Sequence, residues 1–315
     1  MKIDDFRKLA SFSFEYSQED QQKIFDFLRT MGIDPSNIYQ ELEMSSPYVD
    51  THQDTSFSNA RVSLHSHVFY EMIYCRSVTN VEYLVGSQRY RLRNGDIIFI
   101  SPGVSHRPIL PEQMEGNYVR DVIWISPEYM AQLNQMFPHE VVRKGEYLIR
   151  TAGTRWEFLG DLFAAGIRER EEGRMGWEPM VLANTLQILI HLDRAFNDRS
   201  AGMMKAETPD LLGKVVAHIE SHYAEHITIF ELSRRFYVSE STISHQFKQK
   251  MGISIYHYLT QRRLISAKNL IVEGLPLEQV GTKVGFTDYS AFYRAFKQEY
   301  GISPRQYRSL QEHGK

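Results

Sequence analysis

The chain has 315 residues, of which 42% are hydrophobic and 24% charged, the composition of an ordinary globular protein. At roughly 100–200 residues per domain, this length predicts at least two domains. The single cysteine, Cys75, excludes an intrachain disulfide. The polar N-terminus and the lack of an apolar run of roughly 18–20 residues exclude a signal peptide and a membrane span. We therefore expect a cytoplasmic protein with no membrane partner.

Charge is distributed unevenly along the chain. Residues 209–315 contain 14 Lys/Arg and 10 Asp/Glu, a net charge of +4, whereas the rest carries 22 and 29, a net charge of -7. A basic C-terminal third beside an acidic body favours nucleic-acid contact at the basic end. An ordinary solvated surface would give the same balance, so charge alone does not decide between the two.

The first half of the chain predicts a helical extension followed by a β-domain. Residues 19–31 form an amphipathic pattern typical of a short helix, within an N-terminal extension that we place at 1–60. Residues 61–126 alternate runs rich in β-branched and aromatic residues with turns such as Asn94-Gly95-Asp96. This pattern predicts a small β-barrel or sandwich.

A cluster of histidines lies in this β-domain. His65, His67 and Glu71 have odd numbers and would share one face of a continuous strand, and His106 follows the segment GDIIFISPGVSH. Three imidazoles and a carboxylate inside a barrel could hold a divalent metal. The pattern H-x-H-x3-E and the later Gly, Pro and His resemble a cupin, with one residue fewer than usual between Pro102 and His106. In cupin enzymes these four positions are metal ligands.

The middle of the chain predicts helices and a linker. Helices are expected at about 156–170 and 178–196, within a connector at 127–197. The second helix carries an apolar stripe, which indicates either a dimer seam or packing onto the barrel. The small, polar segment 198–210 is typical of an interdomain linker. The residues of the stripe are Leu182, Leu186, Leu189 and Ile190.

A repeat marks the C-terminal third. FKQKMGIS, from Phe247, and FKQEYGIS, from Phe296, are offset by 49 residues and share six of eight positions. In the first copy Thr228 and Glu231 have capping-box spacing before one helix. The next helix, 240–250, begins after Ser239, and each copy is a pair of short helices joined by a tight turn.

The second copy has helix caps and a turn at corresponding positions. Gly285 lies in its turn, Thr287 or Asp288 caps the next helix, and Gly301 ends it, as Gly252 ends the first copy. A helix of 18 residues, 255–272, is expected between the copies. Its length of roughly 27 Å approaches the roughly 34 Å between successive major grooves on one DNA face.

Residues 209–315 resemble the tandem helix-turn-helix DNA-binding domain of the AraC/XylS transcription regulators. The segment VGFTDYSAFYRAFKQEYGISPRQYR, residues 284–308, matches that family's second motif, and Arg262, Arg263, Ala267 and Leu270 match its linker helix. The resemblance implies that residues 211–312 place two recognition helices in successive major grooves of double-stranded DNA.

The outward-facing residues of both recognition helices are candidate DNA contacts. Arg294 is the strongest base-reading candidate because arginine binds guanine O6 and N7 with two hydrogen bonds; contact with phosphate alone is the alternative. The full set of candidate base contacts, which matches the family's positions, is Ser241, Ser244, His245, Tyr289, Ser290, Ala291 and Arg294. The candidate phosphate contacts, which otherwise lie on a solvated helix face, are Arg262, Arg263, Lys297 and Arg305.

The expected fold is multidomain α+β, with an N-terminal cupin-like β-barrel flanked by helices and a C-terminal all-α double helix-turn-helix domain. The resemblance implies an effector-binding sensor, because sensor domains of this family have the same barrel, usually without metal. We therefore expect no cofactor and no enzymatic activity. The candidate effector pocket consists of His65, His67, Glu71, Tyr83 and His106.

The expected function is transcription regulation by sequence-specific DNA binding under control of a small-molecule effector. A sugar-like ligand is favoured because the pocket is polar and aromatic with few net charges. Family resemblance favours an activator that acts on RNA polymerase, and a homodimer. The alternative is a metal-dependent cupin enzyme or metal sensor with a DNA-binding appendage, its metal held by His65, His67, Glu71 and His106.

Overall fold

The computed structural model describes residues 44, 46–56, 64–111, 113, 116–136, 147–197, 202–203 and 210–313. The helix expected at 19–31 lies outside these ranges. The chain divides into two compact units, and the division falls inside the long helix α10, between Ile265 and Ser266. Within the described ranges, no helix is long and apolar enough to cross a membrane.

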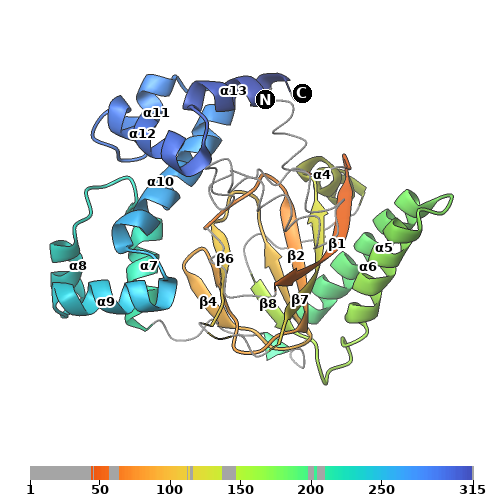
Figure 1. Cartoon of the computed structure of the whole chain (residues 1–315). Coiled ribbons are helices and arrows are strands. Elements are labelled where there is room, and N and C mark those ends of the chain that lie inside the picture. The colour runs from red at the N-terminus through yellow and green to blue at the C-terminus, as the bar shows by residue number, and fades with distance from the viewer. Residues whose placement is uncertain are drawn as a thin grey trace, which may run out of the picture. The chain divides into compact units, whose positions relative to one another are not determined.

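The first part of the chain forms two antiparallel sheets (Figure 1). The larger has the strand order β1-β7-β2-β5-β8-β9, and the smaller has the order β4-β3-β6. The strands are β1 (Val49–Ser56), β2 (Tyr70–Ser77), β3 (Glu82–Val85), β4 (Gln88–Arg91), β5 (Asp96–Ile100), β6 (His106–Ile109), β7 (Tyr118–Ile125), β8 (Tyr147–Arg150) and β9 (Gly202–Met203).

The alternation of side chains along the central strands separates two cores. On β2, Ile73 and Cys75 point into a core that the two sheets share, and Tyr83 and Val85 of β3 enter it from the other side. Met72 points to the opposite face of the large sheet, where it joins a core shared with helices. The β-domain is therefore a layered structure whose interior lies between the two sheets.

Helices cover the outer face of the large sheet. They are α4 (Pro127–Met136), α5 (Leu159–Glu172) and α6 (Trp177–Asn197), and the last two run antiparallel along the face of β1, β2 and β7 (Figure 1). The apolar stripe expected on α6 faces the large sheet. Leu189 is fully buried, and Leu182, Leu186 and Ile190 pack against the same core, so the stripe packs onto the sheet within the chain.

The β-domain is larger than the range 61–126 expected for it. β1 begins at Val49 and pairs along its whole length with β7. β8 pairs with β5, and β9, inside the expected linker, pairs with β8. These strands are separated from the rest by segments without a clear β pattern, so local alternation did not reveal them. Their membership in the sheet depends on long-range pairing.

The C-terminal part is helical throughout. After α7 (Leu211–His222), the first helix pair is α8 (Ile229–Phe236) and α9 (Glu240–Met251), and the second is α11 (Leu277–Lys283) and α12 (Tyr289–Tyr300). α10 (Ile255–Val272) connects them, with the bounds expected from the sequence, and α13 (Pro304–His313) follows. Figure 1 shows both pairs as short helices joined by tight turns.

The expected helix caps are confirmed. The Thr228 side chain and the Glu231 carboxylate form a reciprocal capping box at α8. Ser239 caps α9, and Asp288 rather than Thr287 caps α12. Ser303 and Gln306 form a further reciprocal pair at the start of α13. Local sequence therefore determines where these helices begin.

The turns inside the two helix pairs differ in one respect. Gly285 has a φ of 97° in the second turn, in the left-handed region where glycine is unstrained. The corresponding residue of the first turn is Tyr237, with a φ of 56° and 94% of its surface exposed. A tyrosine in this conformation carries backbone strain without compensating side-chain burial.

Candidate functional site

The first candidate recognition helix, α9, has a buried and an exposed face. Ile243 and Phe247 point into the core of the first helix pair. Ser241 and His245 are exposed, and Ser244 is half-buried beside them. The cap at Ser239 sets the start of the helix and thus the rotation that presents these three side chains outward. The geometry is that of a helix that can lie in a major groove with its polar face toward the bases.

The second candidate recognition helix, α12, is arranged in the same way. Phe292 and Phe296 are fully buried and their rings contact each other, and the Phe296 ring also contacts those of Tyr300 and Tyr307. On the opposite face, Ser290 is exposed, whereas Tyr289 and Ala291 are half-buried at the N-terminal end. The aromatic core holds α12 rigidly, so the outward face is presented in one orientation.

Arg294 lies at the centre of the outward face of α12. Its side chain is exposed and makes no ion pair or hydrogen bond with the residues that the structure describes. A guanidinium that is not used inside the protein can form two hydrogen bonds to guanine. Lys297, one turn further along, and Arg305, on α13, are exposed as well and suit contact with phosphate.

Two of the expected phosphate contacts have partners inside the domain. Arg262 donates to the Glu220 carboxylate over 2.6 Å and stacks on the Tyr223 ring. Arg263 donates to the backbone carbonyls of Tyr223 and Glu225 over 2.7 and 2.8 Å. Phosphate contact by these arginines stays a prediction, and the acceptors that they already have come from α7 and its C-terminal turn.

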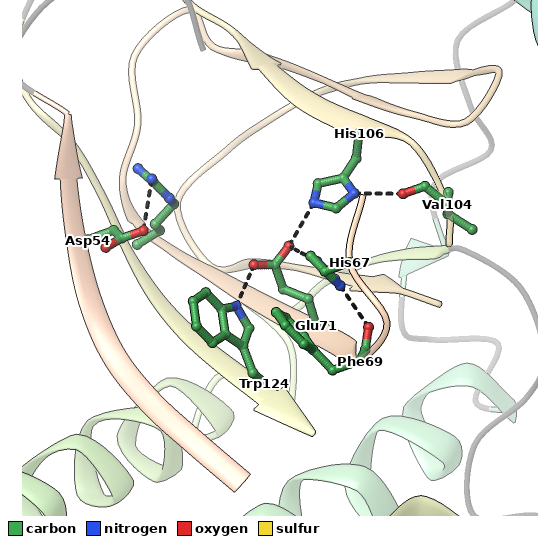
Figure 2. Close-up of polar contacts among 8 residues, drawn as sticks. Asp54, His67, Phe69, Glu71, Val104, His106 and Trp124 are labelled. Atoms are coloured by element: carbon green, nitrogen blue, oxygen red, sulfur yellow. Dashed lines mark hydrogen bonds and ion pairs between the residues drawn. The ribbon is translucent and has the colours of Figure 1, made fainter. Parts of the chain in front are cut away.

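The histidine cluster of the β-domain converges on the carboxylate of Glu71 (Figure 2). Oε2 of Glu71 lies 3.5 Å from Nε2 of His67 and 3.2 Å from Nε2 of His106. Oε1 accepts a hydrogen bond of 2.8 Å from the indole N–H of Trp124. Glu71, His67 and His106 are all buried. A buried carboxylate therefore has one oxygen held by an indole and the other facing two imidazoles.

The outer nitrogens of both imidazoles are fixed by the backbone. Nδ1 of His67 lies 2.8 Å from the carbonyl oxygen of Phe69, and Nδ1 of His106 lies 2.9 Å from that of Val104. A carbonyl only accepts, so each Nδ1 carries the proton. The other ring nitrogen, Nε2, of each histidine faces the carboxylate of Glu71 (Figure 2).

The other two expected pocket residues lie around this cluster. The ring of His65 lies 4.3 Å from that of His106, and the ring of Tyr83, on β3, lies 6.4 Å from it in a stacked arrangement. His65 and His67 precede β2 and are not part of one continuous strand with Glu71. The expectation that one continuous strand places these side chains on a shared face was therefore wrong. All five side chains nevertheless lie close together. His65 is brought there by a β-bridge to His106.

Burial and contacts determine the charge of the cluster. Burial alone would raise the pKa of the Glu71 carboxyl, but its interactions with His106 and His67 hold that pKa well below the usual range. Burial lowers the pKa of His67 and raises that of the Tyr83 phenol well above its usual value. The cluster therefore presents an ionised carboxylate beside His67 and Tyr83, whose neutral forms burial favours.

Trp124 is a member of this cluster that sequence reasoning missed. It lies directly opposite Glu71 in the pairing of β2 with β7, so the two side chains share one face. In the sequence, the only indication of this residue's role was a tryptophan within a strand-like run. Its contact with Glu71 follows from the register between strands 53 residues apart, which no local pattern specifies.

Comparison with known proteins supports the assignment of the helical part. Residues 232–309 match a family model described as a helix-turn-helix domain. The transcriptional activator RhaS of Salmonella arizonae is 26% identical over 254 residues, covering 78% of this chain and 86% of its own length. RhaS of Escherichia fergusonii is 26% identical over 251 residues with the same coverage. The similarity thus includes the β-domain as well as the helix pairs.

Two solved DNA-binding or C-terminal domains match about a third of this chain. The C-terminal domain of AraT from Geobacillus stearothermophilus is 29% identical, covers 33% of this chain and 88% of its own, and has a TM-score of 0.32. The DNA-binding domain of AdpA, solved with a target DNA, is 26% identical, covers 34% and 97%, and has a TM-score of 0.33.

The repeat, the capped helix pairs with buried inner and exposed outer faces, and the matched family model agree with one another. The relatives are named as transcriptional activators. The chain therefore contains a helix-turn-helix domain and is similar along most of its length to regulators of transcription.

Proposed function

We propose that this protein activates transcription from a specific operator in response to a small molecule bound in the β-domain. The observation that carries the proposal is the pair of helix-turn-helix units, each with a recognition helix whose inner face is buried and whose outer face is polar. The printed names of the relatives support activation. An activator of this kind contacts RNA polymerase and acts in the cytoplasm.

The outer faces of the recognition helices read the operator in two successive major grooves of double-stranded DNA. Arg294 reads a guanine, and Lys297 and Arg305 bind phosphates beside it. The other base contacts are Ser241, Ser244, His245, Tyr289, Ser290 and Ala291. The DNA-binding domain comprises residues 211–312, and a homodimer would bind two such sites at once.

The effector binds at the cluster of His65, His67, Glu71, Tyr83 and His106. An ionised carboxylate beside the Tyr83 phenol and His67, whose neutral forms burial favours, suits a neutral, hydroxyl-bearing ligand such as a sugar and disfavours an anion. The Glu71 carboxylate would accept hydrogen bonds from hydroxyl groups, and the Tyr83 phenol would donate one. To regulate, the effector must bind the DNA-competent state with a different affinity from the incompetent one.

The test uses the full-length protein and DNA selected from a random pool. Affinity for the selected sequence is measured with and without each member of a panel of neutral sugars, organic acids and peptides. We expect one neutral sugar to change the affinity, and Tyr83→Phe to reduce this response while leaving effector-free DNA binding intact. Selection of no sequence would contradict specific regulation, and a response only to acids or peptides would contradict the ligand class.

A further inference from the structure

We propose that Asp210 is a positioning residue that attaches the first recognition helix, α9, to the smaller sheet of the β-domain. Its carboxylate binds Arg89 of β4 and Lys250 of α9 at the same time. All three residues belong to one compact unit, Met44–Ile265. The inference rests on the proposed function, because it concerns how α9 is presented to the operator.

The two oxygens of the Asp210 carboxylate have different partners. Oδ1 accepts a hydrogen bond of 2.9 Å from the backbone N–H of Gly213 and so caps α7. Oδ2 accepts one of 2.8 Å from the Arg89 guanidinium and one of 2.9 Å from the Lys250 ammonium. Burial would raise the pKa of the Asp210 carboxyl, but these hydrogen bonds lower it from 3.8 to about 2. The ionised carboxylate therefore joins three elements, β4, α7 and α9.

Apolar packing beside the ion pairs supports the same attachment. Leu84 lies directly opposite Arg89 in the pairing of β3 with β4, so the two side chains share one face of the smaller sheet. Leu84 is buried in the same core as Leu212 and Val215 of α7. The Arg89 side chain is only 10% exposed. Removing one partner from such a desolvated ion pair costs more than it would on an open surface.

The contact lies on the side of α9 that faces away from its polar surface. With 3.6 residues per turn, Lys250 is about 20° around the helix from Ile243 and about 180° from Ser241. Ile243 points into the core, whereas Ser241 is exposed. A partner of Lys250 therefore leaves the side chains that face the operator uncovered. The contact can hold α9 in a fixed orientation while α9 reads DNA.

Asp210→Asn separates positioning from simple attraction between charges. The substitution removes a negative charge, so electrostatics alone predict tighter binding to the DNA phosphates. Loss of positioning predicts weaker binding instead, because α9 would have to be ordered when the DNA binds. Asparagine caps helices about as well as aspartate does, so Gly213 keeps its acceptor and α7 keeps its first turn.

The experiment uses the full-length protein and the DNA sequence that it selects from a random pool. Replacement of the outward residues of α9 by alanine identifies the bases that α9 reads, and Arg294→Ala identifies those that α12 reads. The α9 residues replaced together are Ser241, Ser244 and His245. Affinity is then measured for the selected sequence and for single-base changes at both sets of positions. Each recognition helix thus has its own readout.

We expect Asp210→Asn and Arg89→Gln each to lower the affinity for the selected sequence about 3- to 10-fold. Discrimination between bases should fall at the α9 positions and stay unchanged at the α12 positions. Arg91→Gln is the matched control, since Arg91 lies two residues further along β4 and is 3.9 Å from Glu82. It removes the same charge from the same strand without affecting Asp210, so DNA binding should match that of the wild type.

Circular dichroism establishes that each variant is folded, and Arg89→Gln leaves the cap of α7 intact if Asp210→Asn does not fold. Tighter binding by Asp210→Asn without loss of discrimination would overturn the proposal, as would equal losses in Arg89→Gln and Arg91→Gln. Amide hydrogen exchange of the DNA-free protein gives a second readout. The α9 amides should exchange faster in Asp210→Asn, and unchanged exchange would overturn the attachment. A protein that selects no DNA sequence, or whose α9 reads no base, would refute the proposed function, and faster exchange would still support the attachment of α9.

Discussion

Gly281→Ala is expected to destabilise the second helix-turn-helix and weaken DNA binding, although alanine favours helices. Gly281 lies in α11, where it is buried against α12. A Cβ atom added there would lie 2.8 Å from Cβ and 3.1 Å from Cγ of Phe292. Atoms so close to a backbone cannot rotate away, so α11 and α12 would have to separate.

Two opposing terms determine the size of the effect. Alanine gains about 1 kcal/mol over glycine in a helix interior. Overpacking a filled core costs about 1–3 kcal/mol, and the fully buried Phe292 leaves no space for relaxation. The net loss should therefore be at most about 2 kcal/mol, accompanied by a shift of α12 and of Arg294 on its outer face.

The first helix pair supplies a matched control. Ser233 occupies the position corresponding to Gly281, and its hydroxyl donates to the Phe230 carbonyl over 2.8 Å. Ser233→Ala adds no atom, so it should change the free energy of unfolding by less than about 1 kcal/mol. The measurements are amide hydrogen exchange in α11 and α12 of the full-length protein and affinity for selected DNA. Exchange as slow as in the wild type together with unchanged affinity would refute the predicted close contact.

Four further changes test other parts of the structure. Arg294→Ala should weaken binding to selected DNA by about 1–3 kcal/mol, and an equal loss on random DNA would assign the side chain to phosphate instead. Phe296→Ala should cost about 3–5 kcal/mol in a urea titration because the ring is fully buried among aromatic side chains, and an unchanged midpoint would contradict that packing. Burial lowers the pKa of Lys268 from 10.5 to about 7, so the folded protein binds fewer protons than the unfolded chain between these pH values. The free energy of unfolding should therefore rise as the pH increases through this window, and Lys268→Met should abolish this rise. The same pH dependence of stability in both proteins would show that other groups cause it. Tyr237→Gly should stabilise the first helix pair by about 1 kcal/mol by relieving its positive φ, whereas a lower thermal midpoint would show that the exposed tyrosine contributes more than the strain costs.

The helical domain could be predicted almost completely from the sequence. Thr228, Ser239 and Gly252 act on hydrogen bonds within a few residues of themselves, so helix ends follow from local chemistry. The offset of 49 residues between the two copies of the repeat is enough to indicate two equivalent units. Which side of each recognition helix is buried followed from the spacing of Ile243, Phe247 and their counterparts.

The β-domain could be predicted only in part. The turn at Gly95 and the alternation around it revealed a sheet, but β1, β8 and β9 belong to it through pairing with distant strands. The choice between a dimer seam and a packing surface for the α6 stripe also needed the tertiary structure. In each case the deciding contacts join segments far apart in sequence, whose proximity no local propensity encodes.

The sequence by itself determined that a basic tandem helix-turn-helix follows a β-rich body, and which residues of the recognition helices point outward. Only the tertiary structure decided the chemistry of the buried cluster and the roles of individual arginines. Trp124 meets Glu71 through strand register, and Arg262 meets Glu220 through helix packing. Capping and periodicity are short-range properties, whereas the convergence of His67, Glu71 and His106 depends on three separate segments closing around one point.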